Sequence, residues 1–381
     1  MNTAPELGIY IHWPFCEKKC PYCDFNSHVR QSIDHSDWLR AYLNELRYYA
    51  NETPNHIINS VFFGGGTPSL MKASVVGKIL DEIQALWHCS KDIEVTAEAN
   101  PSSSENKHFK DFRRAGINRL SIGIQSLRDQ SLLFLGRLHN ADNAINAIKN
   151  AAEVFPRFSF DLIYALPGQT PKMWEKELKE ALHLAQGHIS LYQLTIEPGT
   201  EFHKKRVRAA IETVGAELYE TTQDIMNKAN LPAYEISNHA KKGEESRHNL
   251  IYWTGGDYLG IGPGAHGRIT HKLQTDMMHN YRDPEKWLSL AITNKFGGQK
   301  RETLSDEERR DELVLMGLRL INGISLQQFK LLTGQPLIKM LDKNKIKILT
   351  NQGYLSTNHG VFKATSSGRQ RLNAIITYLL T

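Results

Sequence analysis

Six apolar runs recur along the first 200 residues, and amphipathic stretches separate them. The runs are centred near Ile9, Phe62, Val95, Ile122, Leu162 and Tyr192. Their spacing of roughly 30 to 50 residues is the size of a βαβ unit. Between them, residues 74–87 and 174–185 repeat their apolar positions with the helical period. Alternating strands and helices predict a parallel sheet covered by helices, in the α/β class.

Six units without a clear seventh and eighth predict an incomplete (β/α)6 barrel, and an open doubly wound sheet is the alternative. In both architectures the carboxyl ends of the strands carry the active site. Each of the six runs ends in polar or glycine residues, so we expect a functional site along this edge. These residues are Tyr10, His12, Gly64–Thr67, Glu98, Asn100, Gln125, Ser126, Asp161, Gln193 and Glu197.

The pattern changes after Pro198, where charged loops interrupt the chain. Ser305 and Glu308 have the spacing of a capping box before the apolar run LVLMGLRL. The tail then reads as three helices, a hairpin with Asn358–Gly360 as its turn, and a last helix. This outline resembles a winged-helix α+β unit. We therefore predict three parts, at residues 1–240, 241–300 (a connection) and 301–381.

Composition narrows the class of protein only modestly. The 381 residues carry 46 basic and 41 acidic side chains, for a net charge of +5 spread along the chain. Such a mixed surface gives no reason to expect nucleic-acid binding, and the tail has no strongly basic recognition helix. The sequence contains neither a signal-peptide pattern nor a run long enough to span a membrane, so we expect a cytoplasmic protein.

Three of the four cysteines fall in one short stretch, IHWPFCEKKCPYCDF, with the spacing C-x3-C-x2-C at Cys16, Cys20 and Cys23. In a reducing compartment this clustering favours metal or redox chemistry, whereas the isolated Cys89 is expected to be an ordinary thiol. A structural zinc site needs four ligands, and His12 or His28 could complete one. A cubane iron–sulfur cluster held by three cysteines instead leaves one iron open to another ligand.

The cysteine triplet, with an aromatic residue before its last cysteine, resembles the signature of the radical S-adenosylmethionine (SAM) superfamily. FFGGGTPS after the second run is similar to the glycine motif of that superfamily, where backbone groups approach the ligand closely. The resemblance implies a radical SAM partial barrel with a [4Fe-4S] cluster on Cys16, Cys20 and Cys23. SAM would bind the fourth iron and be cleaved to a 5′-deoxyadenosyl radical.

Further motifs resemble the oxygen-independent coproporphyrinogen III oxidase family. They are YIHWPFCEKKCPYCDF, GGGTPS, EANP, GIQS, LGRLH and DLIYALPGQT. This resemblance implies cluster-bound SAM contacts from Tyr10, Gly65 and Glu98. It implies a second SAM pocket formed by Gly66, Thr67, Gln125, Arg137 and Asp161. Ordinary capping and salt-bridge roles are the alternative for these residues.

Two features depart from the oxidase pattern. The oxidase motif continues to a fourth cysteine, where this chain has Phe25, and the oxidase has a longer arm before its first strand. In addition, H-N-x-x-Y-W from His248 to Trp253 resembles the haem chaperones of the HemW type. Neutral histidine is a common haem ligand, and Tyr252 and Trp253 offer flat apolar surface. The alternative is a structural histidine–aromatic cluster that closes the barrel.

The sequence therefore predicts a haem chaperone on a radical SAM scaffold, with His248 as the haem contact and haem, SAM and a [4Fe-4S] cluster as cofactors. Its partners would be haem and an unidentified acceptor protein, which could be membrane-associated, and the chain would act as a monomer or homodimer. The first alternative is the coproporphyrinogen III oxidase itself. The second is a zinc-binding or DNA-binding regulator, which would contain zinc and no labile sulfide.

Overall fold

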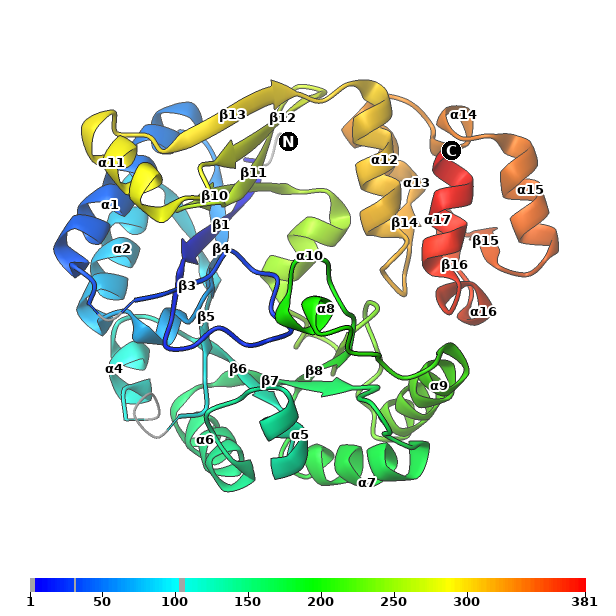
Figure 1. Ribbon diagram of the computed structural model, residues 1–381. Helices are drawn as coiled ribbons and strands as arrows, with labels where there is room; N and C mark the ends of the chain where they lie inside the picture. Colours follow the sequence, from blue (N-terminus) through cyan, green and yellow to red (C-terminus); the bar gives the residue numbers. More distant parts are fainter. Residues whose placement is uncertain (1–3, 31, 103–106) are drawn as a thin grey trace.

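The computed structural model describes residues 4–30, 32–102 and 107–381. Within them, one sheet of 11 strands has the order β13-β12-β11-β10-β1-β4-β5-β6-β7-β8-β9 (Figure 1). Its central strands are β1 (Glu6–Trp13), β4 (Ile57–Gly65), β5 (His88–Ala99), β6 (Arg119–Gln125), β7 (Arg157–Tyr164) and β8 (His188–Gln193). They pair in parallel and in chain order. The six predicted strands and the incomplete barrel are therefore confirmed.

Helices cover the outer face of this curved sheet (Figure 1). They are α1 (His35–Glu52), α2 (Ala73–Leu86), α4 (Phe109–Arg114), α5 (Asp129–Phe134), α6 (Ala141–Val154), α7 (Pro171–Leu182) and α9 (Glu212–Lys228). The two segments predicted as helices from their periodicity are α2 and α7, with ends shifted by one to three residues. Each buries one apolar stripe against the strands.

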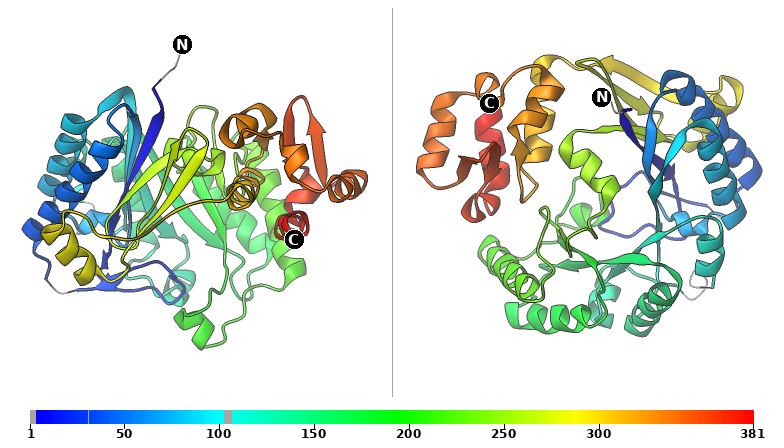
Figure 2. Two further views of the ribbon diagram at one scale, coloured as in Figure 1. Left: turned by 90° about the horizontal axis from the view of Figure 1, so that it is seen from above. Right: turned by 180° about the vertical axis from the view of Figure 1, so that it is seen from behind.

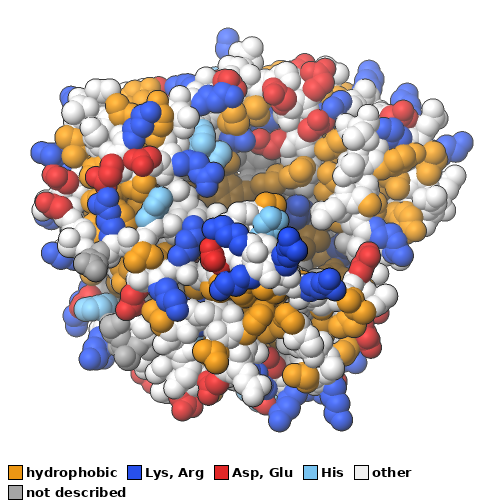
Figure 3. Space-filling model, viewed as in Figure 1, with side chains coloured by type: hydrophobic (Ala, Val, Ile, Leu, Met, Phe, Trp, Pro, Cys, Tyr) orange, Lys and Arg blue, Asp and Glu red, His pale blue; other side chains and the backbone are white. Residues whose placement is uncertain are grey.

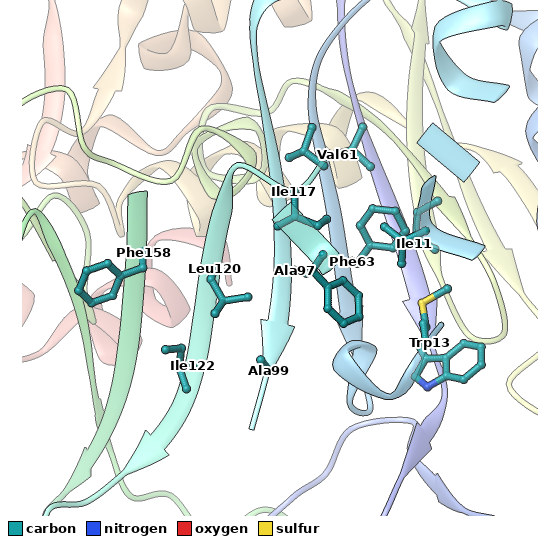
Figure 4. Packing of buried hydrophobic residues seen from close by; sticks show 14 of the residues in the cluster. Ile11, Trp13, Val61, Phe63, Ala97, Ala99, Ile117, Leu120, Ile122 and Phe158 are labelled. Atoms are coloured by element: carbon teal, nitrogen blue, oxygen red, sulfur yellow. The ribbon is translucent and has the colours of Figure 1, made fainter. Parts of the chain in front are cut away.

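The main hydrophobic core lies between the strands and these helices (Figure 4). Ile11, Val61 and Phe63 are fully buried there, and six of the eight residues of β1 are buried. Near-continuous burial is typical of parallel strands, because such strands are covered on both faces. It explains why these strands read as apolar runs rather than as alternating patterns.

Residues 241–300, predicted as a connection, add strands to the sheet. Together with the few residues before and after it, this stretch contains β9 (Asn238–Ala240), α10 (Arg247–Thr254), β10 (Asp257–Ile261), β11 (His266–His271), β12 (Gln274–Asn280), α11 (Pro284–Thr293) and β13 (Gly298–Thr303). Strand β10 pairs in parallel with β1, and β11 to β13 follow antiparallel. The buried carboxylate of Glu45 on α1 holds this extension, because it accepts hydrogen bonds from Gly262 N–H, Asn280 Nδ2 and Trp287 Nε1.

The C-terminal elements have a hydrophobic cluster of their own and lie to one side of the sheet (Figure 2). They are α12 (Asp306–Gly317), β14 (Ile324–Ser325), α13 (Leu326–Thr333), α14 (Leu337–Met340), α15 (Lys343–Asn351), β15 (Leu355–Asn358), β16 (Val361–Ala364), α16 (Ser366–Arg369) and α17 (Leu372–Leu380). The Ser305–Glu308 capping box is present. His359 and Gly360 turn the hairpin with φ of 52° and 76°, as a type I′ turn requires.

Strand β14, which was not predicted, completes a three-stranded antiparallel sheet with the hairpin. The helices around this small sheet agree with the predicted winged-helix-like tail. The division of the chain at residues 240 and 300 stays a prediction. In the part of the chain that the structure describes, no helix is both long enough and apolar enough to cross a lipid bilayer.

Candidate functional site

The three clustered cysteines lie on the loop that follows β1. Cys16 ends the short strand β2 (Phe15–Cys16), which pairs with β3 (His28–Val29). Cys20 and Cys23 are joined by a turn in which the Cys23 N–H donates to the Cys20 carbonyl at 3.1 Å. All three thiols are partly exposed and line one cavity of about 360 Å³ at the carboxyl ends of the parallel strands.

This cysteine cavity gathers most of the residues that the sequence singled out. Besides the three cysteines, its lining includes Gly65, Gly66, Thr67, Glu98, Gln125, Arg137 and Asp161. Tyr10 lines a neighbouring cavity instead, and His248 lines neither of the two. The expectation that polar strand ends would meet at one edge therefore matches the geometry. What these residues bind stays a prediction.

Two side chains approach the cysteine sulfurs directly. Arg137 Nη1 donates to Cys20 Sγ at 3.2 Å, and Thr67 Oγ1 donates to Cys16 Sγ at 3.5 Å. Burial raises the pKa of the Cys16 thiol, so an added positive charge is needed to hold it as a thiolate. The Arg137 guanidinium brings a positive charge to the neighbouring Cys20.

The number and the surroundings of the donors bear on whether they hold a cluster or a single metal ion. Among the described residues, no three His, Cys, Asp or Glu side chains are grouped as one metal ion requires. Tetrahedral zinc would bring its sulfurs within about 4 Å of one another, whereas the cysteines of a cubane each bind a different iron and lie farther apart. His12, one candidate fourth zinc ligand, already bonds through Nε2 to the Asn26 carbonyl at 2.9 Å. The donor set thus fits a cubane better than zinc.

Two residues of the cavity lining have buried polar atoms without partners. Within the described residues, Asp161 Oδ1 and Arg137 Nε are buried and have no hydrogen-bond partner. Such atoms are costly unless a ligand or water satisfies them. A carboxylate acceptor and a guanidinium donor facing one cavity suit a ligand with both an ammonium or hydroxyl group and a carboxylate, as SAM has. The cavity therefore passes this test of fit.

Burial raises the pKa of two carboxyl groups in the cavity. Burial, assisted by the nearby Asp161, raises the pKa of Glu98 to about 8, and burial raises the pKa of Asp161 to about 6. Glu98 Oε2 accepts the Gly65 N–H at 3.1 Å, which fixes the carboxyl group at the end of β5. The cavity therefore favours a bound group that brings positive charge.

The glycine motif owes its composition to packing against the chain as well as to any ligand. Gly65 has φ of +110°, and a Cβ there would lie 2.5 Å from the His12 ring. A Cβ on Gly66 would lie 2.5 Å from the Phe15 carbonyl oxygen. The sequence argument assigned these glycines to close approach of a ligand. The structure adds that side chains here would first displace β1 and β2.

Gln125 is held in an unusual backbone conformation at the end of β6. Its φ of 70° lies in the left-handed region, which a residue with a side chain seldom adopts. Such conformations persist only where the surroundings impose them, and they cluster at binding sites. Tyr22, which the sequence marked only as the aromatic residue before Cys23, also lines the cavity, as does Tyr192, which the sequence did not assign to the site. The place of Tyr192 near the end of the sixth apolar run was a signal for it.

His248 occupies a different environment from the cysteine cavity. Helix α10 places Tyr252 on the same face as expected, and His248 Nε2 bonds to the Tyr252 hydroxyl at 2.7 Å. His248 Nδ1 bonds to Ser60 Oγ at 2.9 Å, and the ring stacks on Phe62. The side chain is 1% exposed, and burial lowers its pKa to about 3. Both ring nitrogens are thus engaged, and haem ligation by His248 stays a prediction.

Comparison with known proteins identifies relatives that share this fold and these motifs. The sequence matches the family described as "Radical SAM superfamily" over residues 10–181 and the "HemN C-terminal domain" over residues 304–371. Among solved structures, coproporphyrinogen III oxidase (HemN) from Escherichia coli has a TM-score of 0.83 at 18% identity. That match covers 98% of this chain and 90% of the other, and it shows a shared fold.

Sequence relatives cover the whole chain. "Heme chaperone HemW" from Haemophilus influenzae is 35% identical over 389 residues, and HemW from Escherichia coli is 34% identical over 389; each match covers 100% of both chains. "Radical S-adenosyl methionine domain-containing protein 1, mitochondrial" from Danio rerio is 34% identical over 390 residues, covering 100% of this chain and 88% of the relative. The chain therefore belongs to the radical SAM family that includes HemW.

Proposed function

We propose that this protein is a haem chaperone, which holds a SAM-bound [4Fe-4S] cluster and passes haem to an acceptor protein. The observation that carries the proposal is the mouth of the cysteine cavity. Three thiols line it, while Phe25 lies where the oxidase motif has a fourth cysteine and is 59% exposed. The full-length relationship to proteins named as heme chaperones supports the same function.

In this proposal the chain's own residues hold and orient the cofactors. Cys16, Cys20 and Cys23 would bind three irons of the cluster, and Arg137 would hold a ligand carboxylate with its unpartnered Nε. Asp161 would accept a hydrogen bond from an ammonium or hydroxyl group. When bound, the cluster and SAM would supply one-electron chemistry at this edge of the sheet.

The remaining contacts proposed for SAM follow the walls of the cavity. They come from Tyr10, Gly65, Gly66, Thr67, Glu98 and Gln125. Tyr10 reaches only the adjoining cavity here, where its hydroxyl is bonded to His12 Nδ1 at 3.1 Å. For Tyr10 to contact SAM, the Tyr10 hydroxyl would have to give up its hydrogen bond with His12.

The coproporphyrinogen III oxidase is the competing function, because the two share a fold. The test is to reconstitute the protein anaerobically with iron, sulfide, SAM and reductant, and to offer haem and coproporphyrinogen III separately. We expect a Soret band from bound haem and unchanged coproporphyrinogen III. Formation of protoporphyrinogen IX would establish the oxidase instead. The acceptor, its association with membranes, the oligomeric state and cytoplasmic localisation stay predictions.

A further inference from the structure

A second cavity, of about 680 Å³, adjoins the cysteine cavity and has Gly65, Glu98 and Phe25 in common with it. Its other walls come from the end of β1, from α10, from α12, and from β11 and β12. The face seen in Figure 3 is hollowed near its centre, and His, Lys and Arg side chains lie around the rim of the hollow. We call this space the histidine cavity.

Two histidines face each other across neighbouring strands in its wall. His266 on β11 lies directly opposite His279 on β12, and their rings stack with centroids 4.2 Å apart and planes 18° apart. Within the described residues, neither ring has a hydrogen-bond partner. The unbonded ring nitrogens of a neutral histidine are the atoms that bind metal.

The rest of the lining suits a flat apolar molecule with an anionic edge. The rings of Tyr252 and Tyr258 pack edge to face, with their centroids 4.6 Å apart. Phe25 is 59% exposed. Because Phe25 lines the cavity, this exposed ring is available to pack on a flat apolar ligand. Met316 adds an adaptable apolar side chain on α12.

Charge in the histidine cavity favours an anionic ligand. Arg282 lines it and, in the part of the chain described, forms no ion pair. Arg268 and Lys300 are close enough to disfavour protonation of the histidine pair. Glu98 contributes the carboxyl group in the lining, at the side shared with the cysteine cavity. Haem carries two propionates, which a guanidinium binds well.

We propose that the histidine cavity is the haem site, in which one imidazole of the His266–His279 pair ligates the iron and Arg282 binds a propionate. Phe25, Tyr252 and Tyr258 then pack on the macrocycle. This inference rests on the proposed chaperone function and replaces His248 as the ligand. It places the haem edge beside Glu98 and Gly65, next to the cysteine cavity, so occupancy of one cavity affects the other.

The first test is a titration of the full-length, reconstituted protein with ferric haem, followed at the Soret band. Replacing both histidines (His266→Ala with His279→Ala) should weaken haem binding by about 10–100-fold, as loss of metal-site partners does. Added imidazole should restore the wild-type band in this variant. His271→Ala is the matched control, because His271 lies on the same strand and outside the cavity.

The outcomes separate the two proposals. If the wild-type protein binds no haem, both the chaperone function and this site are wrong. If the wild type binds haem and the double variant binds it equally well, this site is wrong and the chaperone function stands. Circular dichroism of the double variant establishes that it is folded, and rescue by imidazole is a result that a merely structural role of the pair would not give.

A second test isolates the propionate contact. Arg282→Gln should weaken binding of haem by about 10-fold, since a charge-assisted hydrogen bond is lost. The same change should leave binding of haem dimethyl ester, which lacks the two negative charges, as in the wild type. Equal losses for both ligands would show that Arg282 does not bind a propionate.

Discussion

The cysteine cavity and the cluster around His248 (Ser60, Glu94, His248 and Tyr252; the His248 cluster) both contain buried polar side chains. They differ in how completely those side chains are paired. In the cavity, Asp161 Oδ1 and Arg137 Nε have no partner among the described residues. In the His248 cluster, both ring nitrogens of His248 are hydrogen-bonded. The backbone N–H groups of Arg247 and His248 donate to the buried carboxylate of Glu94.

This difference indicates separate roles for two motifs that look equally functional in the sequence. Buried polar groups that are fully paired stabilise one arrangement of the chain, whereas an unpaired group in a cavity wall is one that a ligand or an ordered water can satisfy. The cysteine cavity therefore has the character of a binding site. The His248 cluster has a structural role, because it fixes α10 against β1, β4 and β5. Four substitutions test this difference between the cysteine cavity and the His248 cluster.

The largest effect is expected at the cysteines. Changing Cys20 to Ala should abolish the iron content and visible absorption of the reconstituted protein, because a cubane held by three thiolates cannot lose one. Changing Cys89 to Ala should leave both unchanged, since Cys89 lies on β5 away from the cavity. Full iron loading of Cys20→Ala, or zinc in the wild type, would refute the cluster assignment.

The next largest effect is expected for Glu94, which anchors the start of α10. Glu94→Ala should lower the free energy of unfolding by about 3–5 kcal/mol, because Arg157 and two backbone N–H groups lose a buried anionic partner. Denaturant titration measures this change. Glu175→Ala is the control, since its ion pair with Lys179 is exposed, and it should remain close to wild type.

His248→Ala should lower the free energy of unfolding by roughly 1–3 kcal/mol, because Ser60 and Tyr252 lose a hydrogen-bond partner. Cluster content should stay at the wild-type level. Haem binding should fall only in proportion to the fraction unfolded, measured at several denaturant concentrations. Loss of the Soret band in a variant that melts at the wild-type temperature would show that His248 is the ligand after all.

The smallest effect concerns Glu98 in protein without cluster or SAM. Its pKa is raised from 4.5 to about 8 by burial and by Asp161. Between these values the unfolded chain releases the proton and the folded chain keeps it, so stability falls as pH rises through the window. Glu98→Gln should remove this loss and be more stable than wild type at pH 8 by roughly 1 kcal/mol, given a water-accessible cavity. At pH 4.5 the two should be equal. An equal difference in the free energy of unfolding between variant and wild type at pH 4.5 and pH 8 would contradict the raised pKa of Glu98.

Local sequence was sufficient for the features that depend on neighbouring residues. The six central strands were readable because strands covered on both faces are continuously apolar. The capping box of α12 and the type I′ turn at His359 and Gly360 were readable because each is formed within a few residues. The cysteine triplet belongs with these features, since one loop carries all three thiols.

Tertiary structure decided the features that depend on distant partners. Strands β10 to β13 were missed because short, half-exposed strands give little periodicity, and β10 is fixed by pairing with β1 about 250 residues away in the chain. The hydrogen-bond partners of His248 come from β4 and α10, so its motif alone could not distinguish a haem ligand from a structural histidine. The sequence did not single out His266 or His279, because only the register of β11 and β12 sets the two rings against each other. The sequence determined which residue types were present and their local periods, and long-range burial and strand pairing decided which of them were left without partners.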